Sequence, residues 1–116
     1  GVAVILSECP DIREPREFFD WFTYPTPEAL EKAVRENFLI SGWVAVRHLE
    51  YTRQGTIVLL TRPENVELAR RTGLLAVGTM QEALALAYER CGTTHPRVTV
   101  MPQGANTFPI LAPPAA

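Results

Sequence analysis

Polar side chains suited to acid–base chemistry gather in a short loop near the start of the sequence, Ser7-Glu8-Cys9-Pro10-Asp11. Glu8 and Asp11 form a candidate acid–base pair, because two neighbouring carboxyl groups can divide the roles of acid and base. The structural alternative is that Asp11 caps the next turn and Glu8 pairs with an arginine. Cys9 has no activating motif around it, which favours a structural thiol over a nucleophile.

A second polar loop, residues 102–107, reads Pro-Gln-Gly-Ala-Asn-Thr. Its backbone N–H groups could bind an oxyanion, although a plain turn explains the same residues. Gln103 and Asn106 are the side chains in this loop that we expect to face a substrate.

The remaining reactive residues do not form a recognisable ligand set. Cys91 is far from Cys9 in the sequence, and His48 and His95 each stand alone. Two isolated cysteines and two lone histidines lack the spacing of a metal site, and a disulfide framework would need more cysteines. The sequence also has no Gly-x-Gly-x-x-Gly after its first strand and no P-loop. We therefore assign no catalytic residue, no metal ligand and no cofactor to this chain itself.

The composition is that of an ordinary globular domain. The 116 residues carry 47% apolar and 21% charged side chains and a net charge of −2. A domain of this size can bury a sizeable core. The few basic residues do not interleave with aromatic ones, which argues against nucleic-acid binding. No apolar run approaches the length of a membrane span and no signal peptide is visible, so we expect a cytoplasmic protein with no membrane contact.

The polar loops need strands to hold them, and four segments have the pattern of buried strands. The first is a continuous apolar run rich in β-branched residues, which is typical of a strand buried on both faces of a parallel sheet. The predicted strands are residues 2–6, 56–60, 74–77 and 98–101.

Helical patterns separate the strands. Thr26 and Pro27 predict a helix start, and two capping boxes are expected at Thr61-Arg62-Pro63-Glu64 and Thr79-Met80-Gln81-Glu82. Ser41-Gly42 predicts a break, and Gly73 and Gly92 predict helix ends. The expected helices are residues 16–22, 27 to about 38, 43 to about 52, a short one to 71, and one from about 79 to 92.

The alternation of strands and helices predicts an α/β fold with right-handed crossovers. We expect a three-layer α/β/α sandwich around a mostly parallel, about four-stranded, Rossmann-like sheet. The domain should cover residues 1–108, and residues 109–116 should form a Pro- and Ala-rich tail. Ligands bind outside the carboxyl ends of the strands in such sheets, where the two polar loops lie in the expected fold.

Several segments, taken in order, resemble the C-terminal domain of the nickel-pincer lactate racemase family. They are VAVILSEC, the aromatic helix REFFDWF, the helix PEALEKAVRENF, Trp43-Val44-Ala45, the helix TMQEALALA and the ending VMPQGANTFPI. The resemblance spans most of residues 1–111.

The resemblance implies that this chain is a fragment of a larger enzyme. Family members have a separate N-terminal domain, which holds the nickel-pincer nucleotide cofactor and supplies the histidines that move the substrate proton. The implied partners are that domain of the same protein and a small 2-hydroxy acid substrate, and a homo-oligomer stays open. The chain alone would be inactive, and its role would be to shape the substrate pocket.

The resemblance places a pocket-lining aromatic side chain at Trp43. Together with Glu8, Asp11, Gln103 and Asn106, it completes the set of candidate substrate-binding residues. The alternative for Trp43 is a core position against the REFFDWF helix. The alternative for the whole chain is a stand-alone, non-catalytic α/β module for ligand binding or assembly.

Overall fold

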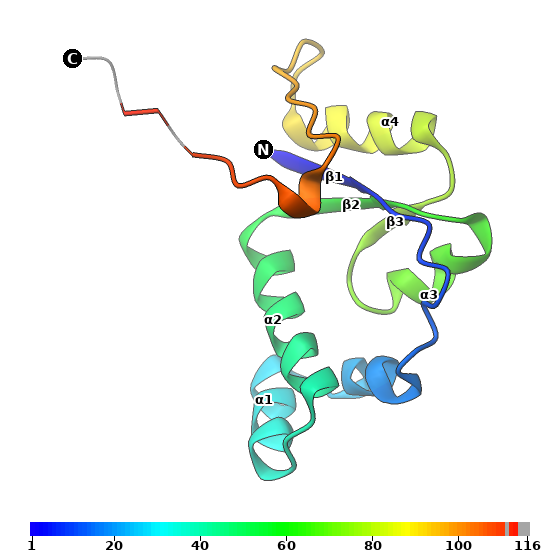
Figure 1. Ribbon diagram of the computed structural model, residues 1–116, viewed down its shortest axis with the longest axis vertical. Coiled ribbons are helices and arrows are strands. Elements are labelled where there is room, and N and C mark those ends of the chain that lie inside the picture. The colour runs from blue at the N-terminus through cyan, green and yellow to red at the C-terminus, as the bar shows by residue number, and fades with distance from the viewer. Residues whose placement is uncertain (111, 114–116) are drawn as a thin grey trace.

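The computed structural model describes residues 1–110, 112 and 113 of the chain, and part of the expected tail at 109–116 lies outside the described residues. Its centre is a parallel sheet of three strands in the order β1-β2-β3 (Figure 1). Val2 pairs with Thr56, and Val58 pairs with Leu75. The strands are β1 (Val2–Leu6), β2 (Thr56–Leu60) and β3 (Leu75–Val77).

Helices cover both faces of this sheet, because neighbouring residues of a strand point to opposite sides. On one face, Val58 and Val77 pack against Ala83 of α4 (Met80–Cys91). On the other, Leu59 packs with Ala69 of α3 (Val66–Arg70), which follows the 3-10 helix η2 (Pro63–Asn65). The sheet with η2, α3 and α4 is called the sheet unit below.

The long connection between β1 and β2 folds into a second group of helices, which we call the helical unit. It consists of the 3-10 helix η1 (Arg16–Thr23), α1 (Pro27–Glu36) and α2 (Ile40–Gln54), and lies below the sheet in Figure 1. It has a core of its own, formed by Trp21, Leu30, Val34 and Ala45.

Two helix starts follow the local signals in the sequence. The Thr26 hydroxyl accepts a hydrogen bond from the Ala29 N–H at 3.1 Å. Thr79 and Glu82 form the full capping box, in which the Thr79 N–H donates to the Glu82 carboxylate at 3.1 Å. Gly92 ends α4 in the left-handed conformation at φ +65°, as expected of a C-terminal glycine.

The predicted break at Ser41-Gly42 is wrong, because α2 begins at Ile40 and runs through both residues. A Cβ atom on Gly42 would lie 2.8 Å from the Val34 side chain and 2.9 Å from the Trp21 ring. Glycine therefore serves close packing of α2 against its neighbours here, and it does not end a helix.

The capping box predicted at Thr61 is also wrong. The Thr61 hydroxyl donates to the Glu8 carbonyl at 3.2 Å and makes no cap for the helix that follows. Pro63 still begins η2, as proline does at a first helical position.

The predicted fourth strand is not confirmed, and neither is the four-stranded Rossmann-like sandwich. Residues 98–101 have no regular structure, and Val98 and Val100 are 67% and 79% exposed. Beyond them, the 3-10 helix η3 (Gly104–Asn106) makes one short turn.

Candidate functional site

The loop that follows β1 is fixed by side chains from the segment after β2. The Asn65 amide donates to the carbonyls of Glu8 and Cys9, at 3.0 and 2.9 Å. Cys9 has a positive φ of 49°, which is uncommon for a residue other than glycine. Asn65 and Thr61 thus hold a local backbone conformation that the loop would not adopt by preference.

The two acidic candidates of this loop have different surroundings. The Glu8 carboxylate accepts a hydrogen bond from Arg62 at 2.7 Å, in an ion pair at the carboxyl edge of the sheet. Asp11 is exposed in the next turn, where its carbonyl accepts from the Glu14 N–H at 2.9 Å. Arg62 is already paired with Glu8, so an anion that binds at this edge would have to compete with the Glu8 carboxylate for the Arg62 guanidinium.

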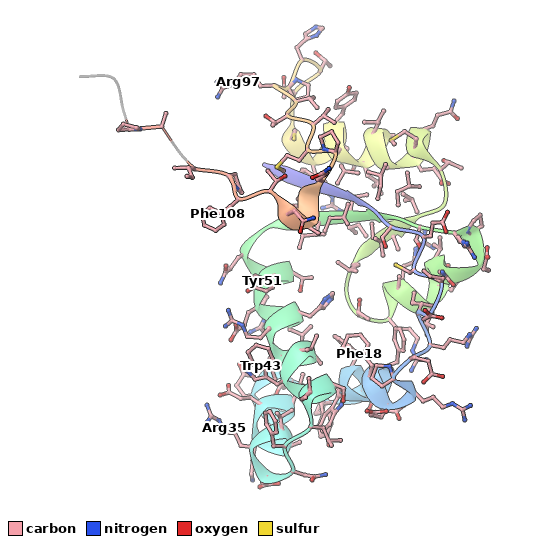
Figure 2. All side chains as sticks on the ribbon, in the orientation of Figure 1. Phe18, Arg35, Trp43, Tyr51, Arg97 and Phe108 are labelled. Carbon is pink, nitrogen blue, oxygen red and sulfur yellow. The ribbon has the colours of Figure 1, made fainter. Side chains whose placement is uncertain are left out.

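The other candidates lie elsewhere in the molecule. Trp43 is 52% exposed on α2 in the helical unit (Figure 2). Gln103 and Asn106 are exposed at η3, where the Gln103 carbonyl accepts from the Asn106 N–H at 2.9 Å. Figure 1 shows η3 well away from the carboxyl ends of β1 and β2, where Glu8 and Asp11 follow β1. The five candidates are therefore not brought together into one site.

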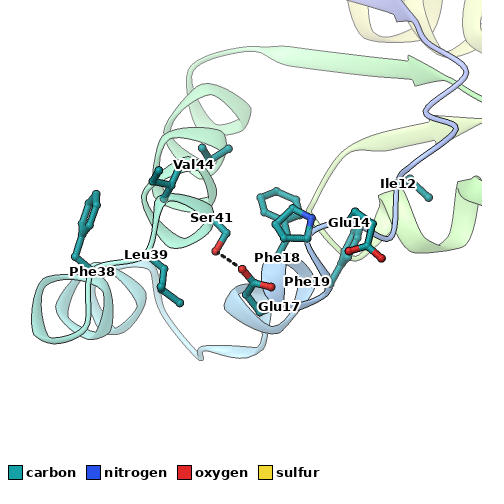
Figure 3. A pocket seen from close by; sticks show the side chains of 11 residues that line it. Ile12, Glu14, Glu17, Phe18, Phe19, Phe38, Leu39, Ser41 and Val44 are labelled. Atoms are coloured by element: carbon teal, nitrogen blue, oxygen red, sulfur yellow. Dashed lines mark hydrogen bonds between the residues drawn. The ribbon is translucent and has the colours of Figure 1, made fainter.

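An open groove of about 760 Å³ lies between the loop after β1, η1 and the start of α2 (Figure 3). Most of its lining side chains are apolar, and the polar exceptions are Glu14, Glu17 and Ser41. The apolar lining residues are Ile12, Pro15, Phe18, Phe19, Phe38, Leu39, Ile40 and Val44.

A short chain of hydrogen bonds joins the wall of this groove to the helical core. The Trp21 indole donates to the Ser41 hydroxyl at 3.1 Å, and Ser41 donates to the Glu17 carboxylate at 3.3 Å (Figure 3). Each buried donor thereby has a partner, and Ser41 is oriented by both contacts. The groove offers acceptors and apolar surface but no cation, so it does not suit a small carboxylate ligand.

Apolar side chains also reach solvent around the turn between α1 and α2. Phe38 and Ile40 are 65% and 74% exposed. Several exposed apolar side chains so close together in the sequence make this region a candidate interaction surface. We call it the junction surface; its members are Phe38, Leu39, Ile40, Trp43 and Val44.

His48 connects the two units and is not part of the groove. Its Nε2 lies 3.0 Å from the Thr72 carbonyl, which identifies Nε2–H as the donor. Burial lowers the pKa of His48 below its ordinary value, and the bond to Thr72 opposes that shift in part. Phe22 contacts the ring edge-on, at 5.5 Å between centroids. These contacts indicate a structural histidine.

A metal-centred cofactor does not fit the donors available here. Nowhere in residues 1–110, 112 and 113 do three or more His, Cys, Asp or Glu side chains come together as a metal would require. Cys9 and Cys91 are both free thiols. We therefore derive no chemical step through a nickel-pincer group on this chain.

Within residues 1–110, 112 and 113, no helix has the length and apolar character of a membrane span.

Sequence reasoning missed the groove and the junction surface. Glu17 and Ser41 come together only because η1 packs against α2, and no local pattern indicates this. The run Phe38-Leu39-Ile40 was a usable signal, since three apolar residues in a turn between helices have no helix face to bury them.

Comparisons of the chain with protein-family models, curated proteins and solved structures find no match.

Proposed function

We propose that this chain is the C-terminal domain of a lactate racemase-like enzyme that acts on a small 2-hydroxy acid. In this proposal a separate N-terminal domain holds the nickel-pincer nucleotide, and this chain closes over the substrate. The proposal includes a four-stranded, Rossmann-like sheet, and the three-stranded parallel sheet of β1, β2 and β3 is compatible with it.

The observation that carries the proposal is the junction surface, which forms part of the groove wall and extends beyond it to Trp43. Trp43 is 52% exposed, so it is available to another domain instead of filling the core of this one. Large aromatic side chains that pack against a second domain can exclude water from a pocket and orient a small ligand. The acidic, apolar groove fits docking of the partner domain better than binding of the substrate carboxylate itself.

The test is to produce the whole protein encoded by the gene and to follow D- and L-lactate and longer 2-hydroxy acids by chiral chromatography. We expect interconversion by the whole protein and none by residues 1–116 alone. In the whole protein, Trp43→Ala should lower turnover by about tenfold or more, as a change at a substrate-positioning residue does. Trp43→Phe, which keeps an aromatic ring, is the matched control and should retain most of the activity.

A gene that encodes no further domain, or a whole protein that leaves every enantiomer unchanged when supplied with the cofactor, would exclude the proposal. The second candidate, a non-catalytic binding or assembly module, would then be favoured by the same groove. That module predicts saturable binding of a partner protein by residues 1–116, with loss of binding in Phe38→Ser and Ile40→Ser.

A further inference from the structure

The outer edge of β1 is unpaired in the described structure. β1 lies at one end of the sheet order β1-β2-β3, and Ile5 and Leu6 are 48% and 61% exposed. The Ser7 N–H donates to the Leu60 carbonyl at 3.0 Å, so this residue points toward β2. Because the hydrogen-bonding direction alternates along a strand, the N–H groups of Val4 and Leu6 point away from β2, to the free edge.

The handedness of the connections determines where a strand after α4 belongs. The crossover from β2 to β3 runs through α3 on one face of the sheet and steps away from β1. The next crossover runs through α4 on the opposite face. Right-handed crossovers on opposite faces step in opposite directions. A parallel strand after α4 therefore belongs on the far side of β1.

The position of α4 and of the chain after it agrees with this. α4 contacts β1 and β2 as well as β3, so it crosses the sheet toward the free edge. A recess is lined by Gly1 together with Thr93, Pro96 and Thr99, which puts the segment after α4 beside the amino end of β1 (Figure 1). This is where a strand parallel to β1 would begin.

The segment that follows has the composition of a strand. Residues 98–101 read Val-Thr-Val-Met, and β-branched residues of this kind favour the extended conformation. Val98 and Val100 are exposed to solvent and share one side of an extended chain. An unpaired edge and an exposed β-forming segment thus lie close together in one molecule.

We propose that the free edge of β1 is a strand-acceptor site, and that its occupant is residues 98–101 of the same chain, added parallel to β1. The sheet then has the order of residues 98–101, β1, β2, β3. The proposal rests on topology and exposure alone, and it holds whether or not the chain belongs to a racemase. Its effect is to pair the outward N–H groups of Val4 and Leu6 and to shield the edge from other chains.

Amide hydrogen exchange of the full chain, read residue by residue by NMR, tests this. We expect the amides of Val4 and Leu6 to be protected in the unmodified protein. Proline has no backbone N–H, so each proline variant removes one hydrogen-bond donor. Successive N–H groups of an edge strand point alternately to the neighbouring strand and to solvent, so only one of two adjacent prolines removes a bond to β1. Only one of Thr99→Pro and Val100→Pro should therefore release the Val4 and Leu6 amides, speeding their exchange by about tenfold or more.

The other proline variant is the matched control, and unchanged protection of α4 amides shows that both variants fold. Free exchange of Val4 and Leu6 in the unmodified chain would overturn the proposal. The same applies if both prolines act alike, or if neither has an effect. Protection that increases with protein concentration, together with a dimer by light scattering, would show that the edge of β1 pairs with a second copy of the chain. This result would also overturn the proposal.

Discussion

The helical unit and the sheet unit achieve burial with different side chains. Both tryptophans of the chain lie in the helical unit, where Trp21 and Leu30 are 8% and 1% exposed. The sheet unit buries small residues between helix and sheet, among them Ala76 and Ala83 at 1% and 0% exposure. Aromatic and leucine side chains carry much of the burial energy of the helical unit, whereas in the sheet unit Val58, Leu59 and Val77 pack against alanines of the helices.

The two units are therefore vulnerable to different substitutions. Removing a large side chain from the helical unit leaves a cavity, because its neighbours relax only in part. The buried apolar side chains of the sheet unit, such as Val58 and Leu59, are smaller than a tryptophan, so truncating one of them should leave a smaller cavity. Tryptophan fluorescence reports on the helical unit alone, so unfolding of the two units can be followed separately.

The largest expected effect contrasts the two tryptophans. Trp21→Ala should cost about 3–5 kcal/mol of unfolding free energy, because a buried aromatic ring and its hydrogen bond to Ser41 are lost. Trp43→Ala should cost under about 1 kcal/mol in this chain, since Trp43 is half exposed. Urea unfolding followed by far-UV circular dichroism measures both. Equal losses would contradict the division into a core and an exposed tryptophan.

The next effect concerns close packing inside the helical unit. Gly42→Ala should destabilise the protein by about 1–3 kcal/mol, because the new methyl group meets Val34 and Trp21 at under 3 Å. Gly55→Ala is the matched control: no atom lies within 4 Å of its added Cβ, and its backbone is extended. Thermal unfolding should show a lower midpoint for the first variant only, and a neutral Gly42→Ala would show that α2 can move away.

A smaller effect compares the helix caps of the two units. Thr79→Ala and Thr26→Ala should each cost about 1 kcal/mol, since each removes the hydroxyl that accepts a backbone N–H. Thr79→Ser and Thr26→Ser keep the hydroxyl and serve as controls. If Thr79→Ala shifts the fluorescence transition as much as the circular dichroism transition, the units unfold together. A shift in circular dichroism alone would show that the sheet unit unfolds separately.

The smallest effect is a pH dependence at the contact between the units. Burial lowers the pKa of His48 in the folded protein below the ordinary histidine value of about 6.5. At a pH near or just below that value, the unfolded chain therefore binds more protons than the folded protein. Stability should therefore fall as the pH drops through this range and be fully present above it. His48→Gln keeps a donor for Thr72 and does not titrate, so it should lack this component. An identical pH profile for both proteins would contradict the assignment.

The sequence was most informative where a local signal decides the structure. β1 and β2 have the predicted bounds, and β3 begins one residue late, at Leu75. Thr79 and Glu82 form their capping box because every partner lies within one helical turn. These elements depend on periodicity and on neighbours close in the sequence, which a single chain reveals.

Long-range contacts account for what the sequence could not reveal. Ser41-Gly42 has the sequence pattern of a helix break, but in the fold Gly42 lies inside α2 and packs against Trp21 and Val34. Thr61 has the sequence context of a helix cap, but its hydroxyl donates a hydrogen bond to the Glu8 carbonyl instead. The candidate site depended on which loops meet: Glu8 meets Arg62, whereas Trp43 and Gln103 lie in other parts of the molecule. The groove around Ser41 and Glu17 arises only from tertiary packing.

The parallel pairing of β1 with β2 has a consequence for the order of folding. Val2 pairs with Thr56, and the whole helical unit lies between them in the sequence. Closing so long a loop costs chain entropy, and contacts of high sequence separation form slowly. A helical unit that collapses first through local contacts shortens this loop. We expect stopped-flow tryptophan fluorescence to change before the β1 amides become protected, so that the helical unit guides the assembly of the sheet.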